Sequence, residues 1–183
     1  MLLSIVVPVY NEEENIANFY KAVTDVMSGL TYDYELIFVD DGSSDSSAMI
    51  LREIAFNDKH VKVLLLARNF GHQTALTCGL DYAHGDAVIT MDGDMQHPPA
   101  LIPELVRLWE SGYDVVRTIR DSTDDASWAK SFTSKYYYKL MNKMADVPIV
   151  EGGSDFRLMN SKALGTLKRF REHGRFLRGI VGA

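Results

Sequence analysis

Short apolar runs alternate with amphipathic stretches along the first 120 residues of the chain. The apolar runs are rich in Val, Ile and Leu, and they predict strands at 2–10, 34–42, 61–69, 86–94 and 114–120. The amphipathic stretches between them predict helices at 12–30, 44–58, 72–85 and 98–113. Strands separated by single helices predict βαβ units, and therefore an α/β fold with a Rossmann-like, mainly parallel sheet and helices on both faces.

The chain after residue 120 is less regular. A polar segment at 121–127 predicts a loop, a basic and aromatic-rich stretch at 128–144 predicts a helix, and 150–160 predicts a loop that leads into a short strand. The length of 183 residues suits one well-packed domain, and the sequence contains no repeat or linker. We therefore expect residues 1–183 to form a single domain.

The formal net charge of −6 is divided unevenly along the chain. Residues 1–100 carry 15 acidic and 5 basic side chains, whereas residues 101–183 carry 10 acidic and 14 basic ones. This division indicates that the two halves bind differently charged ligands. The strongly basic character of a nucleic-acid-binding protein is absent, so we expect no nucleic-acid partner.

Other features bear on the compartment. The apolar runs fall far short of the 18 residues that a membrane-spanning helix needs. The opening "MLLSIVVPVY" lacks the basic region and cleavage site of a signal peptide, so we interpret it as a strand. Cys78 stands alone, which excludes an internal disulfide and suits a reducing compartment. We interpret Cys78 as a small buried residue rather than as a nucleophile.

Acidic side chains gather where the predicted strands end. Ligands of an open parallel sheet bind beyond the carboxyl ends of its strands, so we expect these side chains to converge on one edge: Glu12, Asp40, Asp41, Asp92 and Asp94. Such a cluster repels itself, and Mg²⁺ or Mn²⁺, which take oxygen ligands, would relieve the repulsion. Gln96 adds a neutral oxygen. Each aspartate taken alone could instead be a turn residue or a helix cap.

The phosphate-binding loops G-x-G-x-x-G and G-x-x-x-x-G-K-[ST] are both absent from the sequence. A phosphate-bearing ligand at an acidic edge would therefore need a metal ion as its bridge. Mg²⁺ is usually held by one or two carboxylates together with substrate phosphates. The residues thus indicate a nucleoside diphosphate group as the ligand.

Several segments, taken in order, resemble one family: "SIVVPVYNEEENI", "YELIFVDDGSSDSS", "LARNFGHQTALTCGLDYAHGD", "MDGDMQHPP", and "GGSDFRLMN" followed by "RFLRGIVG". They resemble the family-2 glycosyltransferases of the GT-A fold. Within that family they are most similar to the polyprenyl-phosphate glycosyltransferases, which include dolichol-phosphate mannose synthase and the bactoprenol glucosyltransferases. The resemblance covers essentially the whole chain, with 1–100 as the nucleotide- and metal-binding half and 101–183 as the acceptor-binding half.

The resemblance implies roles for individual residues. It implies a nucleotide-sugar donor bound by the first strand end and by the aspartates: Pro8, Tyr10, Glu12, Asp40, Asp41 and Asp92. It assigns a divalent metal ion to Asp92, Asp94 and Gln96, with Asp94 also counted as catalytic. It assigns the acceptor phosphate to Arg120, Lys130 and Ser134, with Arg120 counted as catalytic as well.

Further residues concern the acceptor and the membrane. We expect Asp155 near the acceptor, as a catalytic residue that orients the sugar or acts as a base, with Arg157 paired to it or to phosphate. Lysines at 135, 139 and 143 form one helical stripe beside an aromatic one. This pattern suits a helix near an anionic membrane surface, and it equally suits an ordinary amphipathic helix with a solvated lysine face.

The chain departs from the family pattern at two places. Relatives usually have "DLQDPP" where this chain has Met95 and His97. His97 could perturb the acidic edge or face solvent, and we expect it to face solvent. Relatives usually continue past the "FLRG" segment into membrane helices, whereas this sequence ends at Ala183. The chain could be a natural short form, but we expect a soluble catalytic-domain fragment of a protein that works at the cytoplasmic face of a membrane. The resemblance also allows a homo-oligomer.

The expected function is the inverting, metal-dependent transfer of a sugar from a nucleoside-diphosphate sugar, UDP-glucose-like or GDP-mannose-like, to a polyprenyl phosphate. Three alternatives stay open on the residues alone. The acceptor could be a sugar hydroxyl in polysaccharide or cell-envelope glycan synthesis. The chain could bind nucleotide sugars without catalysis. It could also be a metal-dependent phosphohydrolase with Asp92 as its nucleophile.

Overall fold

The computed structural model describes residues 1–119 and 153–169. The first half of the fold consists of β1 (Leu2–Val9), α1 (Ile16–Ser28), β2 (Asp33–Asp40), α2 (Ser47–Asn57), β3 (Val61–Leu65) and α3 (His72–Tyr82). The rest consists of β4 (Ala87–Thr90), the short 3₁₀ helix η1 (Pro99–Leu101), α4 (Ile102–Glu110), β5 (Val115–Ile119), β6 (Gly153–Asn160) and α6 (Ser161–Arg169). The strands and helices predicted up to residue 119 are all present, and most of them are shorter than predicted, although β2 begins one residue earlier.

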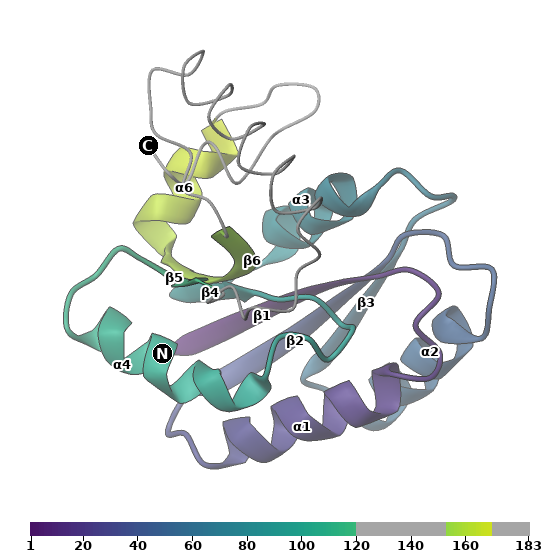
Figure 1. Ribbon diagram of the computed structural model, residues 1–183, viewed down its shortest axis with the longest axis horizontal. Coiled ribbons are helices and arrows are strands. Elements are labelled where there is room, and N and C mark those ends of the chain that lie inside the picture. Colours follow the sequence, from purple (N-terminus) through teal and green to yellow (C-terminus); the bar gives the residue numbers. More distant parts are fainter. Residues whose placement is uncertain (120–152, 170–183) are drawn as a thin grey trace, which may run out of the picture.

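The strands form one sheet in the order β3-β2-β1-β4-β6-β5 (Figure 1). β1 pairs in parallel with β2 and β4, and β2 pairs in parallel with β3. β6 lies antiparallel between β4 and β5. The mainly parallel α/β sheet that the sequence predicts is therefore confirmed.

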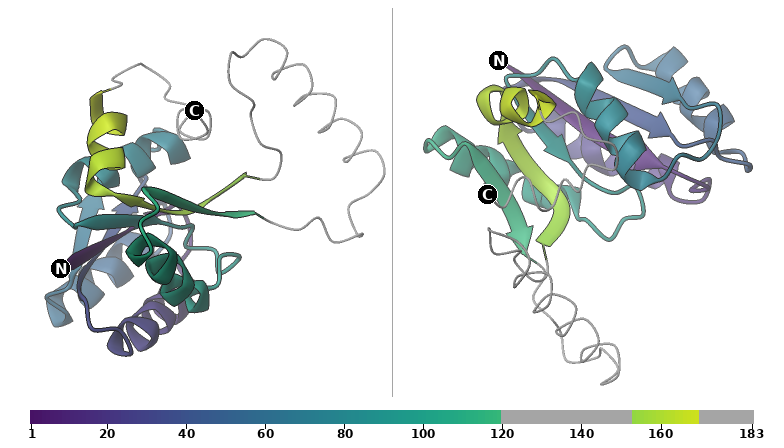
Figure 2. Two further views of the ribbon diagram at one scale, coloured as in Figure 1. Left: turned by 90° about the vertical axis from the view of Figure 1, so that its left-hand side faces the viewer. Right: turned by 90° about the horizontal axis from the view of Figure 1, so that it is seen from above.

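Helices cover both faces of this sheet, as Figure 2 shows edge-on. Helices α1, α2 and α4 pack on one face through a cluster that contains Phe19, Leu51 and Leu105 together with Phe38 of β2. Helices α3 and α6 pack on the other face through Leu76 and Leu164 among others. The sheet is thus buried on both sides, which explains why its central strands read as continuous apolar runs.

Helix α3 packs directly on the sheet at Gly79. A Cβ atom at Gly79 would meet Val6 Cγ1, and it would lie 2.9 Å from Val39 Cγ2. A glycine is therefore required where α3 crosses β1 and β2. This contact fixes the distance of the whole helix from the sheet.

The last two described elements differ from expectation. The sequence predicts only a short strand after a loop at 150–160, whereas β6 is eight residues long and takes an inner position in the sheet. Helix α6 was not predicted. Its start carries a local signal, because the side-chain Oδ1 of Asn160 accepts a 2.8 Å hydrogen bond from the backbone N–H of Ala163. This is the usual geometry of an N-cap residue.

A buried polar network lies at the opposite edge of the sheet from the carboxyl ends of the parallel strands. The carboxylate of Glu35 accepts hydrogen bonds from the Ser4 hydroxyl, the Lys62 ammonium group and the backbone N–H of His84. The Ser4 hydroxyl in turn accepts one from the backbone N–H of Gly85. Burial alone would raise the pKa of Glu35, but these hydrogen bonds outweigh it and lower that pKa.

Candidate active site

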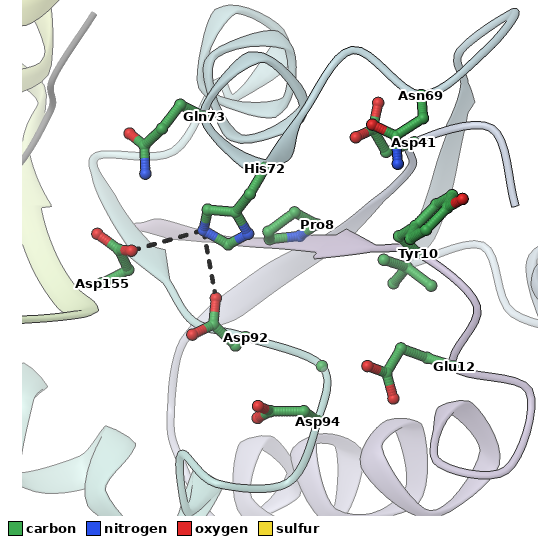
Figure 3. A pocket seen from close by; sticks show the side chains of 12 residues that line it. Pro8, Tyr10, Glu12, Asp41, Asn69, His72, Gln73, Asp92, Asp94 and Asp155 are labelled. Carbon is green, nitrogen blue, oxygen red and sulfur yellow. Dashed lines mark ion pairs between the residues drawn. The ribbon is translucent and has the colours of Figure 1, made fainter. Parts of the chain in front are cut away.

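A cavity of about 580 Å³ opens at the carboxyl ends of the parallel strands. Its lining comes from β1, from the loops after β1, β2, β3 and β4, from the start of α3, and from β6 (Figure 3). The lining residues are Pro8, Val9, Tyr10, Glu12, Asp41, Asn69, His72, Gln73, Asp92, Gly93, Asp94 and Asp155. Of the acidic residues that the sequence predicts to converge, the structure brings Glu12, Asp41, Asp92 and Asp94 together around the cavity, but not Asp40.

The end of β1 supplies Pro8, Tyr10 and Glu12 to the cavity. This end is tied to the start of α2, because the backbone N–H of Glu12 donates a 2.9 Å hydrogen bond to Ser47 Oγ. The carboxylate of Glu12 accepts a 2.7 Å hydrogen bond from the side-chain amide of Asn15. The chain turns sharply between Tyr10 and Glu12, because Asn11 has a positive φ of 54°. The first strand end is thus a fixed part of the cavity wall.

The two aspartates at the end of β2 have different positions. Asp41 lines the cavity, and its two oxygens accept hydrogen bonds from the backbone N–H groups of Phe70, at 2.8 Å, and Gly71, at 2.9 Å. Asp41 therefore holds the loop that leads into α3. Asp40 is buried and accepts a hydrogen bond from the backbone N–H of Ser43, outside the described cavity lining. Ligand contact by Asp40 stays a prediction.

Asp92 and Asp94 follow β4 and both line the cavity. Asp94 Oδ1 accepts a 2.9 Å hydrogen bond from the backbone N–H of Gln96. Gln96 is exposed and does not belong to the described lining of the cavity. Burial is the main cause that raises the pKa of the Asp92 carboxyl above its ordinary value. The His72 and His97 rings oppose this rise, and the nearby Asp155 and Asp94 carboxylates add to it.

Asp155 reaches the cavity from β6, which lies beside β4 in the sheet. Its side chain is only 2% exposed, and its Oδ1 forms a 2.5 Å ion pair with Nη2 of the buried Arg157. Of the two partners that the sequence leaves open for Arg157, the structure shows the Asp155 pair. The backbone carbonyl of Asp155 accepts a hydrogen bond from the Thr90 hydroxyl, which fixes β6 against β4.

His72 lies between Asp155 of β6 and Asp92, which follows β4, as Figure 3 shows. Its Nε2 is 3.5 Å from Oδ1 of Asp92 and 3.5 Å from Oδ2 of Asp155. Five acidic side chains line the cavity, and His72 is the one basic side chain among its described lining residues. The cavity is therefore strongly anionic where these groups meet.

The expectation that His97 faces solvent is wrong. Its side chain is only 12% exposed, and its Nδ1 accepts a 3.0 Å hydrogen bond from the backbone N–H of Asp92. The ring also stacks on Phe156 of β6, with 5.5 Å between ring centroids. Met95, in the turn after β4, has a positive φ of 62°. This turn brings the His97 ring against the backbone of Asp92. His97 therefore links the loop after β4 to β6.

Asn69, His72 and Gln73 also line the cavity, although no sequence motif predicted a role for them. A signal was present, because Asn69 ends the third predicted strand and the other two residues follow shortly after it, which places all three at the same edge of the sheet. The acceptor residues Arg120, Lys130 and Ser134 lie outside the described residues, as does the helix predicted at 128–144. Their roles stay predictions.

The side-chain oxygen atoms at the cavity suit a divalent cation that also binds oxygen atoms of a ligand. Within residues 1–119 and 153–169, no three His, Cys, Asp or Glu side chains form a metal site on their own. Asp92 Oδ1, however, is buried without a hydrogen-bond partner among the described residues, although Nε2 of His72 lies 3.5 Å away. Asp94 lies beside Asp92 in the cavity wall. Two carboxylates completed by diphosphate oxygens suit Mg²⁺ or Mn²⁺.

Comparison with known sequences adds a family match. The sequence model described as Glycosyl transferase family 2 matches residues 4–167. The chain is 44% identical over 178 residues to the uncharacterized glycosyltransferase YkcC of Bacillus subtilis. The aligned region covers 97% of this chain and 55% of that relative. It is 40% identical over 181 residues to the bactoprenol glucosyl transferase of Shigella phage SfV, with 99% and 59% covered. The chain thus spans little more than half the length of these relatives.

A solved structure shares the fold. Glucosyl-3-phosphoglycerate synthase from Mycobacterium tuberculosis, crystallised with Mn²⁺, UDP-glucose and phosphoglyceric acid, superposes with a TM-score of 0.61 at 22% identity. The match covers 88% of this chain and 57% of the synthase. The fold is that of the GT-A glycosyltransferases, as the sequence resemblance implies.

Proposed function

This chain belongs to glycosyl transferase family 2, and we propose that it transfers a sugar from a nucleoside-diphosphate sugar to a polyprenyl phosphate with inversion. The observation that carries the proposal is the acidic cavity bordered by Asp92 and Asp94 at the carboxyl ends of the strands. The name of the SfV relative supports a bactoprenol acceptor and a glucosyl donor. The donor is UDP-glucose-like or GDP-mannose-like. Membership of glycosyl transferase family 2 favours sugar transfer over the phosphohydrolase alternative.

The donor would lie along the cavity with its diphosphate beside Asp92 and Asp94. These two residues would hold Mg²⁺ or Mn²⁺ together with Gln96, and the bound ion would offset the charge that develops on the leaving diphosphate. The nucleoside would lie toward Tyr10 and Asp41, at the opposite side of the cavity from Asp155 (Figure 3). The walls of the cavity are tied together by hydrogen bonds from backbone N–H groups to the side-chain oxygens of Ser47 and Asp41, so the donor site would be preorganised.

The acceptor phosphate would approach from the side of Asp155. Arg120, Lys130 and Ser134 would bind it, with the two basic side chains offsetting its charge. A phosphate monoester has a second pKa of about 6 and is largely ionised near neutral pH, so its oxygen needs no strong base. Asp155 would then orient the reacting groups. The charge division between the two halves of the chain fits an anionic acceptor bound by the second half.

One observation favours a second candidate, transfer to a sugar hydroxyl. Asp155 presents Oδ2 to the cavity beside His72, which is where a carboxylate base for a hydroxyl would be needed. The non-catalytic alternative would bind donor without any transfer.

Membrane association belongs to the proposal as well. Across the described helices, none combines the length and the apolar character of a membrane span. We place the reaction at the cytoplasmic face of the membrane because a polyprenyl phosphate is a lipid and the donor is a nucleotide. A homo-oligomer remains part of the same expectation.

The test is a thermal-shift screen of nucleotide sugars with Mn²⁺ and with a chelator. A donor at about 100 times its Kd should raise Tm by about 5–10 °C, and only with the metal. Asp94→Asn should lose this rise. The matched control is Asp25→Asn, an exposed residue of α1 paired with Lys21, which should keep it. A rise that is equal with and without chelator, or no rise with any donor, would overturn the proposed donor site.

A further inference from the structure

The side-chain carbonyl of Gln73 is an unsatisfied polar group in the cavity wall. Its Oε1 is buried, and it has no hydrogen-bond partner among the described residues. Gln73 lines the cavity from the first turn of α3. Buried polar groups in native proteins are almost always hydrogen-bonded, so an exception of this kind calls for an explanation. A ligand hydroxyl that donates to Oε1 would supply one.

Gln73 lies at one particular end of the cavity. In Figure 3 it stands on the same side as Asp155, whereas Tyr10, Asp41 and Asn69 stand at the other side. Asp92 and Asp94 lie between these two ends. A nucleotide sugar is linear in the order nucleoside, diphosphate and sugar. With the nucleoside near Asp41 and the diphosphate near Asp92, the sugar falls at the Gln73 end.

We propose that Gln73 binds the sugar of the donor, with its side-chain carbonyl accepting a hydrogen bond from a hexose hydroxyl. This inference rests on the proposed function, because it takes the ligand to be a nucleotide sugar. It assigns to Gln73 a part in the choice of sugar, since a site that hydrogen-bonds a substrate hydroxyl discriminates against an analogue that lacks it.

The position of Gln73 is fixed by contacts on each side of it. Gly79 sets α3 against β1 and β2, and Asp41 holds the backbone of Phe70 and Gly71 just before the helix. The backbone carbonyl of Gln73 accepts a 2.7 Å hydrogen bond from the Thr77 hydroxyl within the helix. A polar group on a rigid element is suited to select among hydroxyl positions.

The experiment compares Gln73→Met with the unaltered chain by calorimetry in the presence of Mn²⁺. Methionine keeps the length of the side chain and removes the acceptor. Two ligand pairs are used, UDP with UDP-glucose and GDP with GDP-mannose. For the pair that binds, we expect the affinity for the nucleotide sugar to fall at least about tenfold, or about 1.4 kcal/mol, and the affinity for the nucleotide to change less than twofold. Asp81→Asn, at an exposed position of the same helix, is the control and should change neither affinity.

A second measurement does not depend on the variant folding. Donor analogues that each lack one sugar hydroxyl are titrated into the unaltered chain. One analogue should bind the unaltered chain about tenfold more weakly than the parent donor. Where Gln73→Met is folded, it should bind that analogue and the parent equally.

The outcomes separate the two proposals. Equal losses for nucleotide and nucleotide sugar, or no loss for either, would overturn the sugar contact while leaving the donor site intact. A full set of analogues that all bind the unaltered chain as tightly as the parent would also overturn the contact. If the unaltered chain binds none of the four ligands, the proposed function itself fails.

Discussion

Arg157 and Asp155 form a buried ion pair in β6, with 2.5 Å between Nη2 and Oδ1. The pair occupies one oxygen of the carboxylate that we place nearest the acceptor. The other oxygen, Oδ2, remains toward the cavity, 3.5 Å from Nε2 of His72. The pair therefore fixes the orientation of Asp155 in the site.

The first prediction uses Asp155→Asn to identify the acceptor. Asparagine keeps the shape of the side chain and removes the base. If the acceptor is a phosphate that is already ionised, transfer from a radiolabelled donor to polyprenyl phosphate should persist within about tenfold. If the acceptor is a hydroxyl, loss of the base should cost about 10²–10⁴ in rate. A rate loss of about 10²–10⁴ with polyprenyl phosphate as the acceptor would contradict the phosphate mechanism.

The second prediction concerns the stability of the same pair. Asp155→Asn leaves the charge of Arg157 buried without its carboxylate, and the free energy of unfolding should fall by about 3–5 kcal/mol. Urea unfolding of Asp155→Asn, Arg157→Gln and the double variant forms a cycle. The double variant should lose clearly less than the sum of the two single losses. Simple additivity would show that the two side chains do not stabilise each other.

The third prediction tests the role of His97 in holding Asp92. His97→Phe keeps a ring that can stack on Phe156 but leaves the backbone N–H of Asp92 without its acceptor. We expect about 1–3 kcal/mol of lost stability and weaker Mn²⁺-dependent donor binding. In His97→Asn the side-chain oxygen can take the place of Nδ1, so donor binding should be recovered in part. Equal donor affinities for the two variants would rule out this hydrogen bond as the cause.

The fourth prediction concerns the close packing of α3. Gly79→Ala places a methyl group against Val6 and Val39, so the free energy of unfolding should fall by about 1–3 kcal/mol. The matched control is Gly165→Ala in α6, where nothing lies within 4 Å of the added atom. That substitution should raise helix stability by about 0.5–1 kcal/mol. Equal effects of the two substitutions in thermal unfolding would contradict the close contact.

The fifth prediction concerns pH. Although burial raises the pKa of Glu35, hydrogen bonds from Lys62 and Ser4 lower it below its ordinary value of 4.5. The unfolded chain therefore binds a proton more readily than the folded chain does, and the stability that Glu35 contributes is present above pH 4.5 and lost as the pH falls through its folded pKa. Unfolding by urea between pH 6 and pH 3 should show a smaller decline for Glu35→Gln. Glu53→Gln, at an exposed position of α2, serves as the control and should follow the unaltered chain.

Local patterns in the sequence determined much of this protein. Alternating apolar and amphipathic segments predicted each strand and helix up to residue 119, because burial on both faces of a parallel sheet demands continuous apolar runs. The order of strands and helices also placed Asp41, Asp92 and Asp94 at one edge, since parallel strands end together. These are consequences of chain direction and periodicity, and both can be read along the sequence.

Only the tertiary structure decided what surrounds those carboxylates. The insertion of β6 between β4 and β5 brings Asp155 beside His72 and Asp92 from more than 60 positions away in the sequence. The turn after β4 brings His97 inward against Phe156, where the sequence suggested solvent. Pairing between distant segments depends on backbone hydrogen bonds and packing across the sheet, and no local pattern records which segments will meet.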